Sequence, residues 1–225
     1  MEPAEPAGPP EPAESAESAG DAARADAADR AAGVPPSHAA ETASAPQRDK
    51  ERTRAAILDA AAAMIAEGGS GVSLARIAER AGVSKGALTH HFPHRLELEK
   101  ALVRRSNEQF RNDVHALVDL SENRPGKLLR AYVRALTSSE SRAAEIFSPS
   151  SLLTVLGARP GMEELVQEDA ARWRDELMAD GFDPAQCLAV RLACEGFAMS
   201  IGSPYLTEEE RALAHARLLE LAEPL

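Results

Sequence analysis

The chain has 225 residues, 44% of them hydrophobic and 27% charged, which is long enough for one or two domains with cores of their own. No run of about 18 apolar residues occurs, so we expect no transmembrane helix and no membrane partner. The acidic, proline-rich start does not resemble a signal peptide, and two cysteines make no disulfide framework, so we expect a cytoplasmic protein.

The net charge of −11 argues at first against nucleic-acid binding, but the charge is spread unevenly. Residues 1–49 hold ten acidic side chains and three arginines, a balance of −7. Residues 50–100 hold eight basic and six acidic side chains, a balance of +2. DNA binding depends on a local basic face, so the charge of the whole chain excludes little.

Residues 1–46 are mainly Ala, Pro, Glu, Ser and Gly without an apolar period. Such a segment buries too little surface to offset its ordering entropy, so we expect a disordered acidic tail. Two interpretations remain: a solvated spacer without a specific role, or a tail that screens the basic face behind it.

From Lys50 onward, apolar residues recur every three to four positions nearly everywhere, so the expected fold class is all-α. In the first helix, which Gly68-Gly69 ends, the apolar stripe consists of Ile57, Leu58, Ala61, Met64 and Ile65. Ser73 is placed as the N-cap of a second, short helix.

Ser84 is placed as the N-cap of a third helix, which carries Lys85 to His91 with Leu88 as its inward anchor. Pro93 marks the next boundary, because proline inside a helix loses a hydrogen bond. Three helices with short connections and a turn at Gly82 form a helix-turn-helix signature.

A helix-turn-helix presents helix N-termini, which attract phosphate, and Ser73 and Ser84 lie at two such starts. Gly86 allows a close approach to the groove, and Lys85, Ala87 and Thr89 lie where base edges would be. His90, His91 and Arg95 would flank the phosphate backbone. A metal site is the alternative for the histidines, but Pro93 separates His90 from His94 and no nearby cysteine or acid cluster completes a ligand set. We therefore expect no metal and no cofactor.

The segment from Thr53 to Leu102 closely resembles the DNA-binding domain of the TetR family of bacterial transcriptional regulators. The resemblance rests on Thr53 with Ile57, the Gly68-Gly69 break, the run IAERAGVSKGAL, and the HF pair followed by a basic residue and Leu96. It implies an all-helical homodimer with a DNA-binding head at residues 47–95 and a body at residues 96–225 that binds a small effector and dimerises. Carried over by position, it places Lys85, Gly86, Ala87 and Thr89 at bases. It places four polar residues near phosphates: Ser73, His90, His91 and Arg95.

The sequence of residues 96–225 predicts further helices. The first is long, begins near Leu96 and passes Phe110 and Val114; others are expected from Pro125, over 140–156 and 162–179, from Pro184 to 201, and over 207–222. Pro184 suits a helix start, and Thr207 with Glu210 forms a capping box.

Small residues on the helix from Pro184 allow a close approach of two helices, and leucines supply buried area. With the last helix they resemble the dimer face of the family, although an ordinary internal core is the alternative. The expected interface residues are Leu188, Ala189, Leu192, Ala193, Gly196, Leu213 and Ala216. Cys187 and Cys194 are too far apart on one helix for an intrachain disulfide, so they are buried apolar residues or a redox switch across the dimer.

An effector pocket should lie among the body helices, where large side chains are its candidates or simply core. These candidates are Phe110, His115, Tyr132, Phe147, Met162, Trp173, Met178 and Phe197. Few charges fall on the expected inner faces, so the effector should be mainly apolar.

We therefore expect a repressor that binds an inverted-repeat operator in double-stranded DNA as a homodimer and is released by a ligand. The alternatives are a ligand-activated or redox-sensing regulator and a helical adaptor between proteins that has lost DNA binding. An enzyme is not expected, because the sequence contains no Ser-His-Asp arrangement, phosphate-cradling glycine loop or paired carboxylates in a recognisable frame.

Overall fold

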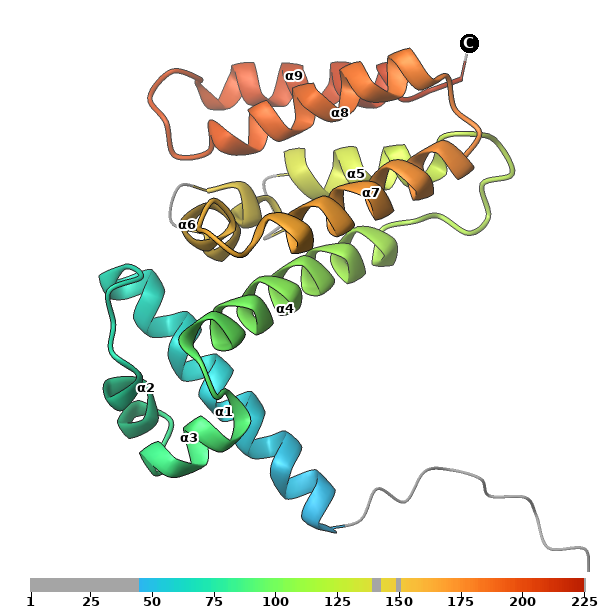
Figure 1. Cartoon of the computed structure of the whole chain (residues 1–225). Coiled ribbons are helices and arrows are strands. Elements are labelled where there is room, and N and C mark those ends of the chain that lie inside the picture. Colours follow the sequence, from blue (N-terminus) through green and yellow to red (C-terminus); the bar gives the residue numbers. More distant parts are fainter. Residues whose placement is uncertain (1–44, 139–142, 149–150, 225) are drawn as a thin grey trace, which may run out of the picture. The chain divides into compact units, whose positions relative to one another are not determined.

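The computed structural model describes residues 45–138, 143–148 and 151–224, and every regular element in these ranges is a helix (Figure 1). The all-α expectation is thus confirmed. The helices are α1 (Ala45–Gly68), α2 (Leu74–Arg80), α3 (Lys85–His91), α4 (Arg95–Ala116), α5 (Lys127–Thr137), the 3-10 helix η1 (Ala143–Phe147), α6 (Leu152–Gly157), α7 (Glu163–Ala179), α8 (Pro184–Met199) and α9 (Glu208–Leu221). The expected tail lies outside the described residues except for its last two positions, which belong to α1.

The first three helices form as their sequence predicts. All five residues of the apolar stripe on α1 are buried, and so is the anchor Leu88 on α3. Ser73 accepts a hydrogen bond from the backbone N–H of Arg76, and Ser84 accepts one from that of Ala87. Gly82 has φ 68°, a left-handed conformation that a residue with a side chain adopts at a cost, and it makes the turn between α2 and α3.

The core beneath these helices continues into the rest of the chain. Leu98 and Leu102 of α4 belong to it, as do Leu156 at the end of α6 and Met162 at the start of α7. Leu156 and Met162 have no exposed surface at all. Leu156 and Met162, together with Leu165 of α7, therefore hold α6 and α7 against the helices that carry the helix-turn-helix.

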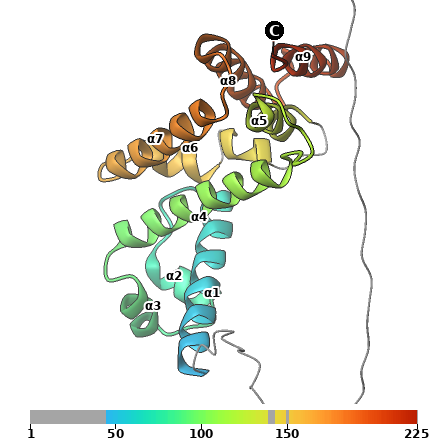
Figure 2. The ribbon, with the colours of Figure 1, turned by 90° about the vertical axis from the view of Figure 1, so that its right-hand side faces the viewer.

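A second core forms around α5, which packs against α4, α8, α9 and η1. Its side chains are buried around nearly the whole circumference, including Leu129, Tyr132 and Leu136. α5 is therefore the central helix of this core, although Arg130 and Thr137 are among its buried side chains. In both ribbon views α2 and α3 lie at one end of residues 43–225 and α8 and α9 at the other (Figure 2).

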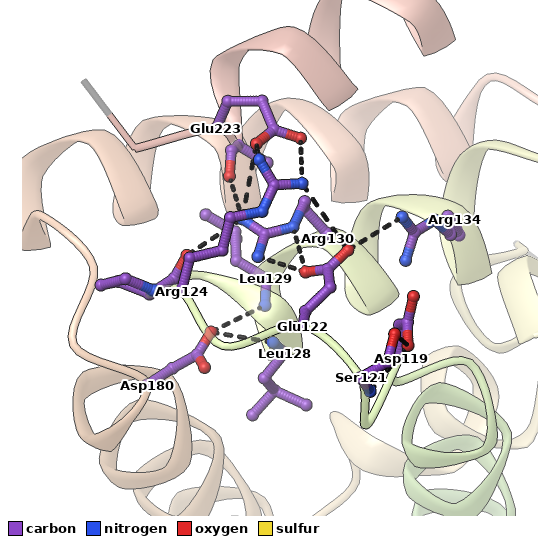
Figure 3. Close-up of polar contacts among 12 residues, drawn as sticks. Asp119, Ser121, Glu122, Arg124, Leu128, Leu129, Arg130, Arg134, Asp180 and Glu223 are labelled. Atoms are coloured by element: carbon purple, nitrogen blue, oxygen red, sulfur yellow. Dashed lines mark hydrogen bonds and ion pairs between the residues drawn. The ribbon is translucent and has the colours of Figure 1, made fainter.

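The N-terminal end of α5 is held by charge, contrary to the expectation of few inner charges. Arg130 is fully buried and donates to Glu122 with Nε at 2.8 Å and to the carbonyl oxygen of Ala222 at 2.9 Å (Figure 3). The hydrogen bond from Arg130 lowers the pKa of Glu122. Asp180 accepts the backbone N–H groups of Leu128 and Leu129, so the helix start is satisfied from α7 (Figure 3).

The expected helix over 140–156 is wrong. Within the described part of that range, the chain forms η1 and then the separate helix α6, which Ser151 caps by accepting from the N–H of Thr154 at 3.1 Å. Pro149 and the serines around it interrupt the sequence there, and proline breaks a helix interior. Pro184 at a helix start and the capping box of Thr207 and Glu210 are both confirmed. Among the described residues, no helix has the length and apolar character needed to span a bilayer.

Candidate nucleic-acid interface

The third helix presents a polar face on an apolar anchor. Leu88 has no exposed surface and packs into the core below, while Lys85, Gly86 and Thr89 are exposed and Ala87 is half-buried. Lys85 has no carboxylate partner among the described residues, so its ammonium group is available to a ligand. A short helix fixed by one leucine can enter a groove without disturbing the core behind it.

Thr89 uses its hydroxyl on its own helix. Its Oγ1 lies 3.1 Å from the carbonyl oxygen of Lys85 and 3.0 Å from that of Gly86, and it donates to them. Such back-bonding leaves the methyl group as the contact surface of the residue. A methyl group suits apolar contact with a thymine methyl better than it suits a polar base edge.

The C-terminal end of α3 lies beside basic residues of α1. The rings of His90 and His91 meet edge to face with centroids 5.7 Å apart, and Arg54 lies 5.2 Å above the ring of Phe92. Partial burial lowers the pKa of His91, and the positive fields of His90, Lys50 and Arg54 lower it further. These side chains form a positive cluster that would favour phosphate.

Lys50 and Arg54 were not among the residues expected at DNA. Both precede the apolar stripe of α1, where the sequence shows exposed positions without a period. The surplus of basic residues in 50–100 was the only signal in the sequence that could have pointed to them.

Arg95 has a different role from the one expected. Its Nε donates to a carboxylate oxygen of Glu99 at 2.7 Å, and its two terminal nitrogens donate to the carbonyl oxygens of Val72 and Ser70. The guanidinium therefore holds the loop before α2 instead of facing phosphate. The side-chain oxygen of Ser73 likewise accepts the capping hydrogen bond of α2. An anion at this position would therefore bind the N–H groups of the helix N-terminus.

Two family profiles match the sequence. The profile described as "Bacterial regulatory proteins, tetR family" matches residues 57–102, and "Tetracyclin repressor-like, C-terminal domain" matches residues 126–223. The chain belongs to the TetR family. No curated protein sequence matches it significantly.

Solved structures share this TetR fold. A transcriptional regulator from Rhodococcus sp. RHA1 is 24% identical, with a TM-score of 0.58 over 77% of this chain and 95% of that one. A TetR-family member from Streptomyces coelicolor A3 is 26% identical, with a TM-score of 0.54 over 75% of this chain and 97% of that one. The multidrug-binding protein EbrR, complexed with ethidium, is 25% identical, with a TM-score of 0.55 over 75% and 98%.

In this TetR chain a buried carboxylate joins the helix-turn-helix to the body. Glu99 on α4 is 3% exposed, and one of its oxygens accepts both from Arg95 and from Nη1 of Arg159, at 2.9 Å in the second case. Arg159 lies just after α6, and Arg95 binds the loop before α2. The path Arg159–Glu99–Arg95 is thus a polar link between the two regions.

The residues expected at a TetR dimer face all lie on the surface of the single chain. The seven named positions on α8 and α9 are exposed, with Leu188 at 56%, Leu192 at 58% and Leu213 at 71%. The internal-core alternative is therefore wrong for them. Met199, Ile201 and Tyr205 extend this apolar surface beyond the end of α8.

The two cysteines lie on the other side of α8. Both are buried and free, and burial raises the pKa of Cys194 to about 12. A thiol with so high a pKa carries almost no reactive thiolate. The redox switch across a dimer thus has no support, because the exposed face of α8 carries neither sulfur.

The effector candidates separate into a packed group and scattered residues. Phe110 lies with its ring centroid 5.7 Å from Tyr132, 5.8 Å from Phe147 and 5.4 Å from Trp173. The structure does not bring His115 or Met178 into this aromatic group. His115 pairs with Glu176 at 3.1 Å, Met178 is 53% exposed, Met162 belongs to the core under the helix-turn-helix, and Phe197 lines a separate cavity beside His215.

Residues 96–225 also contain a buried charged side chain. Arg111 is 3% exposed, lies 2.9 Å from carboxylate oxygens of both Asp169 and Glu176, and stacks 4.3 Å from the centre of the Trp173 ring. Tyr132 donates to Glu195 at 2.9 Å. The aromatic group is therefore bordered by charged side chains, more of them than the expectation of few charges on the inner faces allowed.

Proposed function

We propose that this TetR-family regulator is a repressor that binds an inverted-repeat operator as a homodimer and leaves it when a small molecule binds. In this proposal residues 47–95 are the DNA-binding head and residues 96–225 the effector-binding and dimerisation body. The observation that carries it is α3, a capped helix with an exposed polar face held by the buried Leu88. As a DNA-binding regulator it would work in the cytoplasm.

The groove contacts follow from the exposed side chains. Lys85 would donate to guanine, and Ala87 and Thr89 would contact thymine methyl groups, with Gly86 allowing the close approach. His90 and His91 would contact phosphate together with Lys50 and Arg54 of α1, and the helix starts at Ser73 and Ser84 would add their N–H dipoles.

The homodimer is supported by the uncovered apolar surface of α8 and α9. Large exposed apolar patches are uncommon on monomers and mark sites of association. A two-fold pairing of these helices would hold two heads at a fixed spacing, as two half-sites about one helical turn apart require.

Release by a ligand is supported by the relatives. Solved structures of EbrR are described as complexes of a multidrug-binding protein with ethidium and with malachite green. A ligand that prefers one geometry of the body would shift the population of head spacings, and its effect is limited by that preference.

Selection from a random duplex library tests the proposal, with the full chain at one stated moderate salt and no added ligand. Recovery of an inverted repeat supports a dimeric sequence reader. A Lys85→Ala variant carried through the same selection should relax the preference at one position of each half-site. Recovery of nothing above background overturns the repressor proposal and favours either a head that needs a ligand to bind DNA or the adaptor that works through proteins.

A further inference from the structure

A cavity of about 1070 Å³ lies between α1, α4, η1 and the start of α6. Most of its wall is apolar, with Ala63 and Ala66 of α1, Leu102 and Phe110 of α4, and Leu152 of α6. Pockets for small molecules have such walls and volumes of about 300–1,000 Å³ with a few polar groups.

The polar groups of this cavity give it a negative character. Asp113 of α4 lines it and receives one hydrogen bond from Nε2 of Gln109 at 2.8 Å, and no cationic partner faces it among the described residues. Arg105 also lines the cavity, but its guanidinium pairs with Asp59 of α1.

We propose that this cavity is the effector site and that its ligand is an amphipathic organic cation whose apolar body lies against the apolar wall formed by α1, α4 and α6 and whose charge pairs with Asp113. The inference rests on the proposed function for the consequence of binding, and it names the site and the chemical class.

The position of the cavity gives the ligand a route to the head. Leu102 belongs to the core under the helix-turn-helix, and Phe110 belongs to the core around α5, yet both line the same space. The alanines of α1 at the wall lie on the same helix as Met64 and Ile65, which are buried in the head core. A bound molecule would therefore contact α1 and α4 together and bias their separation.

Fluorescence anisotropy of the full chain with rhodamine 6G tests the site, with fluorescein as the anionic dye on the same ring system. We expect saturable binding of rhodamine 6G and binding of fluorescein at least about tenfold weaker. Asp113→Asn should weaken rhodamine 6G binding about tenfold, the order expected of one charge-assisted contact. Asp175→Asn, an exposed position on α7 away from the cavity, is the matched control and should change nothing.

A second variant tests whether the dye occupies the cavity itself, independently of the charge at Asp113. Ala66→Trp places a large side chain at the wall from an exposed position of α1, so it should remove binding without disturbing a core. Absence of saturable binding, equal affinity of Asp113→Asn and Asp175→Asn, or equal affinity for fluorescein would each overturn the proposal. None of these dye titrations contains DNA, so a failure to bind the dye is distinguishable from a failure of the operator selection.

Discussion

Replacing Glu99 with glutamine should destabilise the protein by about 2 kcal/mol, because this carboxylate links two arginines inside the fold. Its Oε1 accepts from Arg95 at 2.7 Å and from Arg159 at 2.9 Å, so the glutamine oxygen can keep both contacts in place. A hydrogen bond to a charged group contributes about 1.5–3 kcal/mol and a neutral one about 0.5–1.5. Two weakened bonds would cost about 2–3 kcal/mol, and the arginines, whose side chains are 30% and 37% exposed, recover part of it from water.

Urea unfolding measures this loss. With a slope of about 2 kcal/mol/M for a protein of this size, the midpoint should fall by about 1 M at constant slope. Glu97→Gln is the matched control, an exposed glutamate on the same helix, and should stay within about 0.5 kcal/mol of the parent. Equal midpoints for the two variants would refute the claim that Glu99 holds buried charge.

A double-mutant cycle tests whether Glu99 acts through Arg159. If the two side chains interact as the structure shows, Glu99→Gln and Arg159→Gln should be non-additive by at least about 0.5 kcal/mol. Simple additivity would mean that the contact between them contributes nothing to stability, which would refute the polar link through Arg159.

Three further predictions concern DNA and assembly. Lys85→Ala should weaken binding to the selected operator by about 1–3 kcal/mol and leave binding to a scrambled duplex nearly unchanged, by anisotropy titration; equal loss on both would reassign Lys85 to phosphate. Operator affinity should rise as pH falls through the histidine range, because the pKa of His91 is lowered in the unbound protein and a phosphate favours its charged form. The change should occur between the pKa of His91 in the unbound protein and its higher pKa in the DNA complex. The double variant His90→Gln, His91→Gln should remove this pH dependence. Leu192→Glu should convert the proposed dimer to monomers in analytical ultracentrifugation, whereas Met178→Glu, similarly exposed but on α7, should not; dimers in both would place the interface elsewhere.

The helices were predictable where one local signal decided them. The stripe from Ile57 to Ile65 has the period of a half-buried helix, and Ser73, Ser84 and Pro184 stand at helix starts for reasons of backbone hydrogen bonding. The prediction of one helix over 140–156 was wrong, because the apolar residues of this range suggest a single helix although its sequence contains Pro149. Periodicity and breaker signals disagreed there, and the breaker prevailed.

The candidate site was less predictable, because it depends on which helices meet. The exposed face of α3 follows from its own sequence, but the nearness of Lys50 and Arg54 to His91 is a tertiary fact. Arg95 looked like a phosphate ligand by its place after α3, yet the carbonyl groups of Ser70 and Val72 lie within its reach. A long cation binds whatever acceptor the fold brings closest, which the linear sequence does not show.

The junction of head and body combines an apolar contact with a charged one, and the two have different consequences. Leu156 and Met162 hold α6 and α7 against the head core by close packing, which is a weaker constraint on direction than an ion pair. The Glu99 carboxylate requires two guanidinium groups at fixed directions, so it selects one arrangement among those that the apolar contact allows. Leu102, which lines the proposed effector cavity, lies one turn after Glu99 on α4, so a ligand that moves α4 would strain this charged contact.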